Sequence, residues 1–169
     1  WEYAARGKEK NQYVYAGGSE LRLVSWSKEN ADFIPKATGE EGWYGEKPTI
    51  DGLEEEGTTH PVCQKKQNSY GLCDMSGNVW EWTWDWYGSE FYSRLAARKN
   101  PVGTTVGNNR VLRGGSWDVS DRYHKVHYRT ALPPWATNGT EKKQDASSSV
   151  TIKSGSVGFR LVRTVVIKR

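Results

Sequence analysis

The histidines and cysteines are the side chains in this sequence best suited to hold a metal ion or to act as nucleophiles. His124 and His127 lie three positions apart, so a third ligand would complete an iron or zinc site. No Asp or Glu stands at a spacing typical of a site built from two histidines and one carboxylate. The alternative is that both histidines pack within loops or face solvent.

Two cysteines, Cys63 and Cys73, lie ten positions apart. A disulfide between them would indicate an oxidising compartment, whereas two buried free thiols would carry no such implication. The spacing favours neither alternative, because a disulfide requires the two Cα atoms to approach closely in space. Both alternatives stay open at this point.

The elements that would position these residues are short and are separated by long loops. Residues 1–7 are typical of a helix end, with Gly7 as the stop signal. Tryptophan alternates with other residues over 79–84, which predicts a strand with at least one buried face. We also expect strands at 110–113 and 157–163, short strands around 13–15 and 24–26, and a short helix within 89–98. The result is an α+β fold with little helix and much loop.

The composition excludes several classes of protein. The chain of 169 residues is 36% hydrophobic and 26% charged, which is too apolar for a disordered chain and too polar for a membrane protein. No run approaches the ~20 apolar residues of a membrane span. The net charge of +4 is scattered, with acids between the basic residues, so no nucleic-acid partner is expected.

Five motifs occur along the chain in a characteristic order. They are WEYAARG at 1–7, NSYGL at 68–72, DMSGNVWEW at 74–82, RGGSW at 113–117 and GFR at 158–160. In this order they resemble the formylglycine-generating enzyme (sulfatase-modifying factor) family. The resemblance implies an α+β, C-type-lectin-like fold, loop-rich and with little regular structure, in one domain spanning 1–169. It places Trp80, Trp82 and Trp117 in the core. Family members begin upstream of the first motif, so the chain resembles one that lacks its N-terminal part, including any signal sequence.

The resemblance also allows a test for enzyme activity. Members that generate formylglycine oxidise a substrate cysteine by means of two cysteines that bind copper, in the segment after the Gly-Gly-Ser motif. Those two positions fall near Val119 and at His124 of this chain. Neither residue supplies the thiolate that Cu(I) prefers. The resemblance therefore implies no catalytic residues and no copper here.

Calcium is the cofactor that the resemblance leaves in place, because family enzymes bind Ca²⁺ through loop oxygens. One site would use Asn30, Ala31, Glu41 and Trp43, although Glu41 stands where Asp is more usual. The other would use Asn68, Ser69 and Gly71. Hard oxygen ligands on irregular backbone suit Ca²⁺ and would order long loops. The alternative is that these residues only cap turns.

The segment 117–135 has the composition of a recognition surface, since it mixes aromatic anchors with adaptable polar groups. The alternative is ordinary loop packing. If the segment binds a ligand, nine side chains are expected to make the contacts: Trp117, Asp118, Val119, Ser120, Arg122, Tyr123, Tyr128, Thr130 and Leu132.

A second resemblance points the same way. Variable proteins of diversity-generating retroelements, including spirochaete surface lipoproteins, share this fold and diversify a segment between a Gly-Gly-Ser-Trp motif and Gly-Phe-Arg. Their adenine-directed mutagenesis does not produce Lys, Glu, Gln, Met or Trp. None of these five types stands at the positions expected to vary, which are Asp118, Val119, Ser120, Arg122, Tyr123, Tyr128, Thr130, Ala131 and Leu132.

The sequence therefore predicts a non-catalytic, receptor-type domain of a bacterial surface or extracellular protein, which binds a protein or glycan ligand through about residues 117–135. The alternative function is a metal-dependent oxidoreductase of the formylglycine-generating and sulfoxide-synthase superfamily, with His124 and His127 at its metal. A third possibility is a structural remnant within a larger protein.

Overall fold

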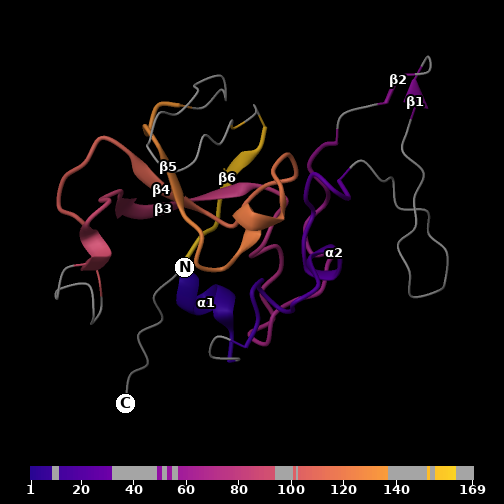
Figure 1. Ribbon diagram of the computed structural model, residues 1–169, viewed down its shortest axis with the longest axis horizontal. Helices are drawn as coiled ribbons and strands as arrows, with labels where there is room; N and C mark the ends of the chain where they lie inside the picture. The colour runs from indigo at the N-terminus through magenta and orange to yellow at the C-terminus, as the bar shows by residue number, and fades with distance from the viewer. Residues whose placement is uncertain are drawn as a thin grey trace.

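A four-stranded mixed sheet forms the centre of the fold (Figure 1). Its order is β5 (Thr130–Leu132), β4 (Arg110–Arg113), β3 (Trp80–Trp86), β6 (Val157–Phe159). β3 runs antiparallel to β4 and parallel to β6, and β4 runs antiparallel to β5. The computed structural model describes residues 1–8, 12–31, 49–50, 53–54, 57–93, 101, 103–136, 152 and 155–162.

The helices of the described residues are short. α1 (Glu2–Arg6) ends at Gly7, whose φ of 64° is readily adopted by glycine. α2 (Leu21–Val24) is a single turn, and 3-10 turns cover Phe91–Ser93 and Asp121–His124. β1 (Thr49–Ile50) and β2 (Leu53–Glu54) form a separate antiparallel pair. Among the described residues, no helix is long and apolar enough to cross a membrane.

Most of the predicted elements are confirmed. The strand expected at 110–113 is β4, the one at 79–84 is β3, and the one at 157–163 begins as β6. The strand expected around 24–26 is wrong, because Val24 ends α2 and Trp26 is buried in the loop that follows. Around 13–15 there is only an isolated bridge between Tyr15 and Gly18. The helix expected within 89–98 is a 3-10 turn at 91–93, and 94–98 lies outside the described residues.

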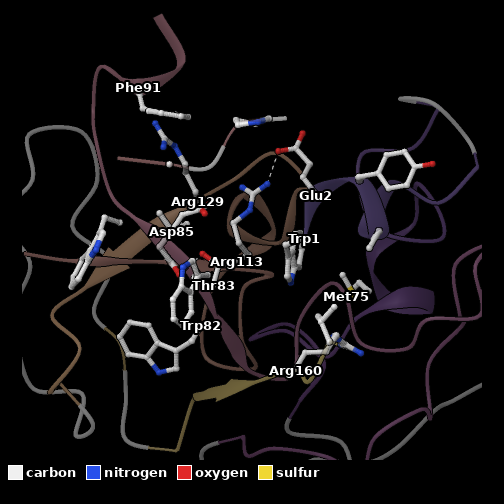
Figure 2. Close-up of a pocket in the computed structure, with 18 of the residues that line it drawn as sticks. Trp1, Glu2, Met75, Trp82, Thr83, Asp85, Phe91, Arg113, Arg129 and Arg160 are labelled. Carbon is white, nitrogen blue, oxygen red and sulfur yellow. Dashed lines mark hydrogen bonds and ion pairs between the residues drawn. The ribbon is translucent and has the colours of Figure 1, made fainter. Parts of the chain in front are cut away.

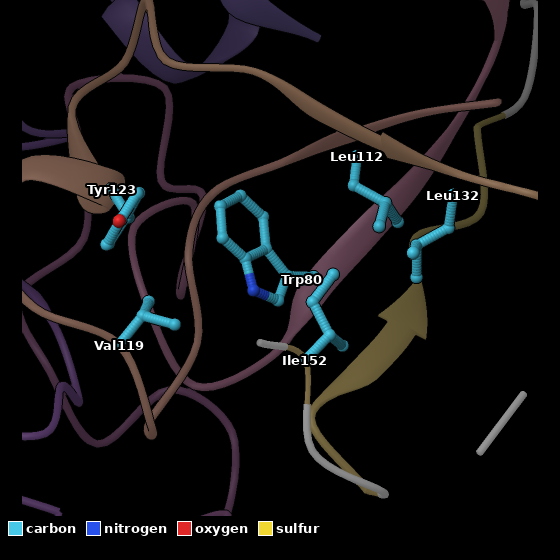
Figure 3. Packing of buried hydrophobic residues seen from close by; sticks show 6 residues of the cluster. All are labelled: Trp80, Leu112, Val119, Tyr123, Leu132 and Ile152. Carbon is cyan, nitrogen blue, oxygen red and sulfur yellow. The ribbon is translucent and has the colours of Figure 1, made fainter. Parts of the chain in front are cut away.

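The main hydrophobic cluster covers one face of the sheet around Trp80, which is fully buried (Figure 3). Figure 3 shows the Trp80 indole with Tyr123 and Val119 on one side and with Leu132 and Ile152 on the other. Leu112 of β4 belongs to the same cluster. A second cluster joins α1 to the loops below it through Ala5, Ala16, Met75 and Val126. Trp80 and Trp117 are thus buried as expected, and Trp82 packs against the first cluster.

Candidate functional site

The buried carboxylate of Glu81 joins three of the five sequence motifs. Arg160 donates hydrogen bonds to both carboxylate oxygens, with Nη2 2.5 Å from Oε1. The indole Nε1 of Trp1 donates to Oε2 at 2.7 Å. Arg160 also donates to the Cys73 carbonyl at 2.8 Å. A buried charge requires such pairing, so the loss of any one of these partners should destabilise the fold.

Arg113 connects the RGGSW motif to α1 and to the chain that enters β5. Its Nη2 lies 2.5 Å from Oε2 of Glu2 and donates to the Val126 carbonyl at 3.0 Å. Its Nη1 donates to the carbonyls of His127, at 3.0 Å, and Tyr128. Burial lowers the pKa of Arg113, and the Glu2 carboxylate opposes that shift. One guanidinium therefore holds three consecutive main-chain carbonyls.

His124 is fully buried at the end of the 3-10 turn Asp121–His124. Its Nδ1 lies 3.2 Å from the Ser120 carbonyl, and its Nε2 lies 3.1 Å from the Ser116 carbonyl. Burial lowers the pKa of His124, and the two carbonyls oppose that shift. Both ring nitrogens face main-chain oxygens, so neither is directed at a metal position.

The other two histidines do not complete a metal site with His124. His127 is exposed, and His60 stacks on Trp26 with ring centroids 3.7 Å apart. Within the described part of the chain, no group of three or more His, Cys, Asp or Glu side chains is placed to hold a metal ion. The packing alternative for His124 and His60 is the one that the structure supports.

The nine side chains expected to form a binding face do not share one exposed surface. Val119, Tyr123 and Leu132 belong to the cluster around Trp80. Trp117 and Thr130 are buried as well. Trp117 is buried as the resemblance implied, and the burial of Val119, Tyr123, Thr130 and Leu132 removes the exposure that a contact face requires.

The physical reason is the path of the chain. The 3-10 turn directs Tyr123 inward, where its ring meets that of Tyr128 edge to face at 5.0 Å. All three residues of β5 are buried beside β4. Arg122 is exposed, and Asp118, Ser120 and Tyr128 are half-buried. The part of this segment that can reach a ligand is thus centred on Asp118, Ser120 and Arg122.

Asn30 and Ala31 of the first expected calcium site have partners within the protein. The Oδ1 of Asn30 accepts the backbone N–H of Ser27 at 2.7 Å, and its Nδ2 donates to the Ser25 carbonyl at 2.9 Å. The Ala31 carbonyl lies 2.9 Å from Nε2 of His60. The other two residues of this site, Glu41 and Trp43, lie outside the described residues.

The second expected calcium site forms a compact turn around Asn68. Its Oδ1 accepts the backbone N–H groups of Tyr70, at 3.0 Å, and Leu72, at 3.1 Å. The hydroxyl of Ser69 accepts the N–H of Lys8, and Gly71 has the positive φ of 73° that the turn requires. An amide oxygen has two lone pairs, and both are used here. The contacts of Asn68 are those of a turn cap.

Cys63 and Cys73 form a disulfide, with their Cα atoms 4.9 Å apart. Cys63 is exposed and Cys73 is buried. Asp74 follows the second cysteine, and its Oδ2 accepts the backbone N–H of Cys63 at 2.7 Å. The bond closes the loop that carries Lys65 and Asn68. Of the two alternatives that the sequence left open, a disulfide and two free thiols, the structure contains the disulfide.

A groove of about 800 Å³ lies on the other face of the sheet, beside α1 (Figure 2). We call it the arginine groove. Its charged lining residues are Glu2, Asp85, Arg113, Arg129 and Arg160, and its aromatic ones are Trp1, Tyr3, Trp82, Trp84, Trp86, Phe91 and Tyr92. None of the sites expected from the sequence corresponds to this groove. The tryptophan alternation over 79–84 was a signal for it, but we assigned that alternation to the core.

Comparisons with known proteins identify the family. Residues 1–165 match the family model described as "Sulfatase-modifying factor enzyme 1-like domain". The chain belongs to this family. The formylglycine-generating enzyme of Streptomyces coelicolor is 34% identical over 143 residues, which is 82% of this chain and 41% of that protein. The chaperone protein LppX of Paenibacillus barcinonensis is 35% identical over 129 residues, 76% of this chain and 39% of that protein.

Among solved structures, Treponema denticola variable protein 1 is similar with a TM-score of 0.59 and 27% identity, covering 94% of this chain and 43% of that one. This similarity and the small mixed sheet confirm the C-type-lectin-like fold of the sulfatase-modifying factor family. The chain spans about two fifths of the length of these relatives.

Family membership allows Val119 and His124 to be compared with the catalytic positions of formylglycine-generating members. These are the positions at which the resemblance places the paired cysteines of formylglycine-generating members. Here Val119 is 5% exposed and packs near Trp80, and His124 is fully buried between two carbonyls. In this member of the sulfatase-modifying factor family, both positions are part of the packed interior.

Proposed function

We propose that this chain is a non-catalytic, ligand-binding domain of the sulfatase-modifying factor family. The observation that carries the proposal is the burial of Val119 and His124, since a reacting thiol must be reachable by its substrate. A valine and a histidine held by main-chain carbonyls offer neither a thiolate nor access. The alternative, a metal-dependent oxidoreductase with His124 as a ligand, conflicts with the contacts of both His124 ring nitrogens.

The binding surface in this proposal is the accessible part of the segment 117–135. Asp118, Ser120 and Arg122 lie in and beside the 3-10 turn, where the His124 ring contacts the carbonyls of Ser116 and Ser120. Recognition commonly uses loops held on a rigid scaffold. The similarity to Treponema denticola variable protein 1 supports a segment open to diversification.

A location outside the cytoplasm is part of the same proposal. The Cys63–Cys73 disulfide supports it, because disulfides persist in oxidising compartments and are rare in the cytosol. A surface or secreted domain would meet the protein or glycan ligands that we expect as partners.

Two measurements test the proposed function. In the first, the purified chain receives copper or Fe(II) and a cysteine-containing peptide, and oxygen uptake and peptide oxidation are followed. We expect neither. Metal-dependent oxygen uptake that is lost on His124→Ala would overturn the proposal in favour of the oxidoreductase.

In the second, the chain is applied to an array of immobilised saccharides and peptides, beside a triple variant with Asp118→Asn, Ser120→Ala and Arg122→Ala. We expect specific signals that the triple variant loses while its melting temperature is kept. The matched control is Arg22→Gln, an exposed arginine in α2. Signals that survive the triple variant unchanged would place recognition elsewhere.

Diversification has its own test, which is deep sequencing of the coding segment for residues 110–163 from a clonal population. If the segment is diversified, substitutions should concentrate at Asp118, Ser120 and Arg122 and spare Gly114–Trp117. A uniform segment would show that diversification is not active there.

A further inference from the structure

The arginine groove has the size and position of a second site. Its volume of about 800 Å³ lies within the range of roughly 300–1,000 Å³ that is typical of small-molecule sites. Side chains alternate between the faces of a strand, so Val111 and Arg113 line the groove while Leu112 points to the cluster around Trp80. The groove is therefore on the face of the sheet opposite to the segment 118–123, and a ligand there goes beyond the proposed function.

Among the residues that the structure describes, acids near the groove are paired with Arg113 and Arg160 but not with Arg129. Arg113 is paired with Glu2, and Arg160 is paired with Glu81. Arg129 forms no ion pair with any residue that the structure describes. Its Nη2 donates a long hydrogen bond, at 3.4 Å, to the Gly88 carbonyl. A guanidinium in this state is a ready partner for a carboxylate, which it can bind through two parallel hydrogen bonds.

The Arg129 guanidinium is held in place by aromatic rings. It lies 4.3 Å from the centroid of Tyr92 and 5.0 Å from that of Tyr87. Figure 2 shows Arg129 between Phe91 and Asp85, with Arg113 beside it. The cation is thus oriented before any ligand arrives, which reduces the entropy lost on binding.

Trp84 and Trp86 flank Asp85 along β3 and are among the residues that line the groove. Trp84 is 86% exposed, an unusual state for so large an apolar side chain. Trp86 is fixed by the Arg110 guanidinium, 3.6 Å from its ring, and by Gly107, where an added Cβ would lie 2.9 Å from the Trp86 Cβ. Arg110 also lies 5.1 Å from the centroid of the Trp84 ring, and the exposed remainder of the Trp84 indole offers a surface on which a ring can stack.

Asp85 decides the class of ligand. Its carboxylate is exposed in the groove and forms no hydrogen bond with the part of the chain that the structure describes. A ligand that covered Asp85 without donating to it would leave a desolvated acceptor unpaired, which is unfavourable. A sugar ring supplies hydroxyl donors for Asp85 and a face for the indoles. We propose that the arginine groove binds a saccharide that carries a carboxylate, with the carboxylate on Arg129 and hydroxyl groups on Asp85.

The test is titration calorimetry of the full chain with two acidic probes, N-acetylneuraminic acid and digalacturonic acid, and with neutral galactose and a peptide with a free C-terminal carboxylate. We expect saturable binding of at least one acidic probe and at least tenfold weaker binding of galactose. Arg129→Gln should weaken the acidic probe at least tenfold, and Trp84→Ala several-fold. Arg22→Gln, the matched exposed arginine, should bind as the wild type does.

Three results would overturn the proposal: no saturable binding of either acidic probe, an Arg129→Gln affinity equal to that of the wild type, or tighter binding of the peptide than of both sugars. Should Arg129→Gln fail to fold, Trp84→Ala decides, because its side chain is almost fully exposed. The Asp118, Ser120 and Arg122 triple variant should keep its affinity for the acidic probe. Failure of this proposal and failure of the proposed function can therefore be told apart.

Discussion

The guanidinium of Arg160 and the carboxylate of Glu81 meet at 2.5 Å although 79 positions separate them in the chain. The pair links β3 to the residue that follows β6, and Trp1, the residue before α1, donates to the same carboxylate. These residues belong to the motifs by which the family is recognised. Their contacts show that the motifs maintain the fold, whereas the chemistry of the formylglycine-generating members depends on other positions.

Glu81→Gln should lower the free energy of unfolding by about 3 kcal/mol, since it leaves the Arg160 charge partly buried without its acid. Urea denaturation measures the change. The control is Glu20→Gln, which breaks the exposed pair with Arg22 and should cost less than about 1 kcal/mol. Equal losses in the two variants would mean that burial adds nothing to the Glu81 pair.

Truncation of two tryptophans of the same strand should change the free energy of unfolding by very different amounts. Trp80→Ala removes a fully buried indole and should cost about 3–5 kcal/mol. Trp84→Ala removes an exposed indole and should change stability by no more than about 0.5 kcal/mol. Thermal unfolding of both variants checks this, and a large loss in Trp84→Ala would assign that side chain to the core rather than to a site.

Stability should depend on pH through Lys65, whose amine lies 3.8 Å from the Trp26 ring centroid. Burial lowers its pKa from 10.5 to about 8. Between these two values the unfolded chain holds the proton and the folded chain has released it, so the free energy of unfolding should rise as pH increases from about 8 to 10.5.

Lys65→Met should lack this rise. The difference between the two proteins, measured by urea denaturation at several pH values, isolates Lys65 from the other groups that titrate there. Parallel pH profiles would contradict the burial effect.

The Cys63–Cys73 disulfide should stabilise the chain by about 2–3 kcal/mol, as expected for a loop of this length. Replacement of both cysteines by serine should lower the melting temperature, and reduction of the wild type with dithiothreitol should lower it by the same number of degrees. The reduced wild type serves as the control for the double variant. No change on reduction would mean that the hydrogen bonds around Asp74 and Asn68 already fix the loop.

Asn68→Ala should lower the melting temperature by the same amount in calcium and in a chelator, because the Asn68 amide oxygen already accepts two backbone N–H groups. Differential scanning calorimetry under both conditions checks this. A loss of stability confined to the calcium-loaded sample would instead identify Asn68 as a metal ligand.

Much of the fold could be predicted from the sequence because its signals are local. The strand at 110–113 is apolar in its middle, and the tryptophan alternation marks β3. Gly7 follows the last residue of α1 and has a positive φ of 64°, which glycine adopts readily. The error at 24–26 arose because Val24 and Trp26 resemble a strand locally, whereas Trp26 is buried through its stacking on His60 from a distant loop.

The candidate sites were harder to predict, because burial of a single side chain depends on the path of the whole chain. Tyr123 and Leu132 have types suited to either a contact face or a core, and only their meeting with Ile152 decides between them. Arg129 likewise becomes a candidate ligand-binding residue only when Arg113 and Arg160 are seen to be paired elsewhere.

The segment between the RGGSW motif and β5 is held at five of its main-chain carbonyls as well as by its buried side chains. Arg113 binds the carbonyls of Val126, His127 and Tyr128, and the ring of His124 lies against those of Ser116 and Ser120. Every amino acid has the same carbonyl. The outward side chains of this segment can therefore be substituted without changing the path of its main chain. Mutations at these positions would alter the chemistry of the surface at little cost in stability.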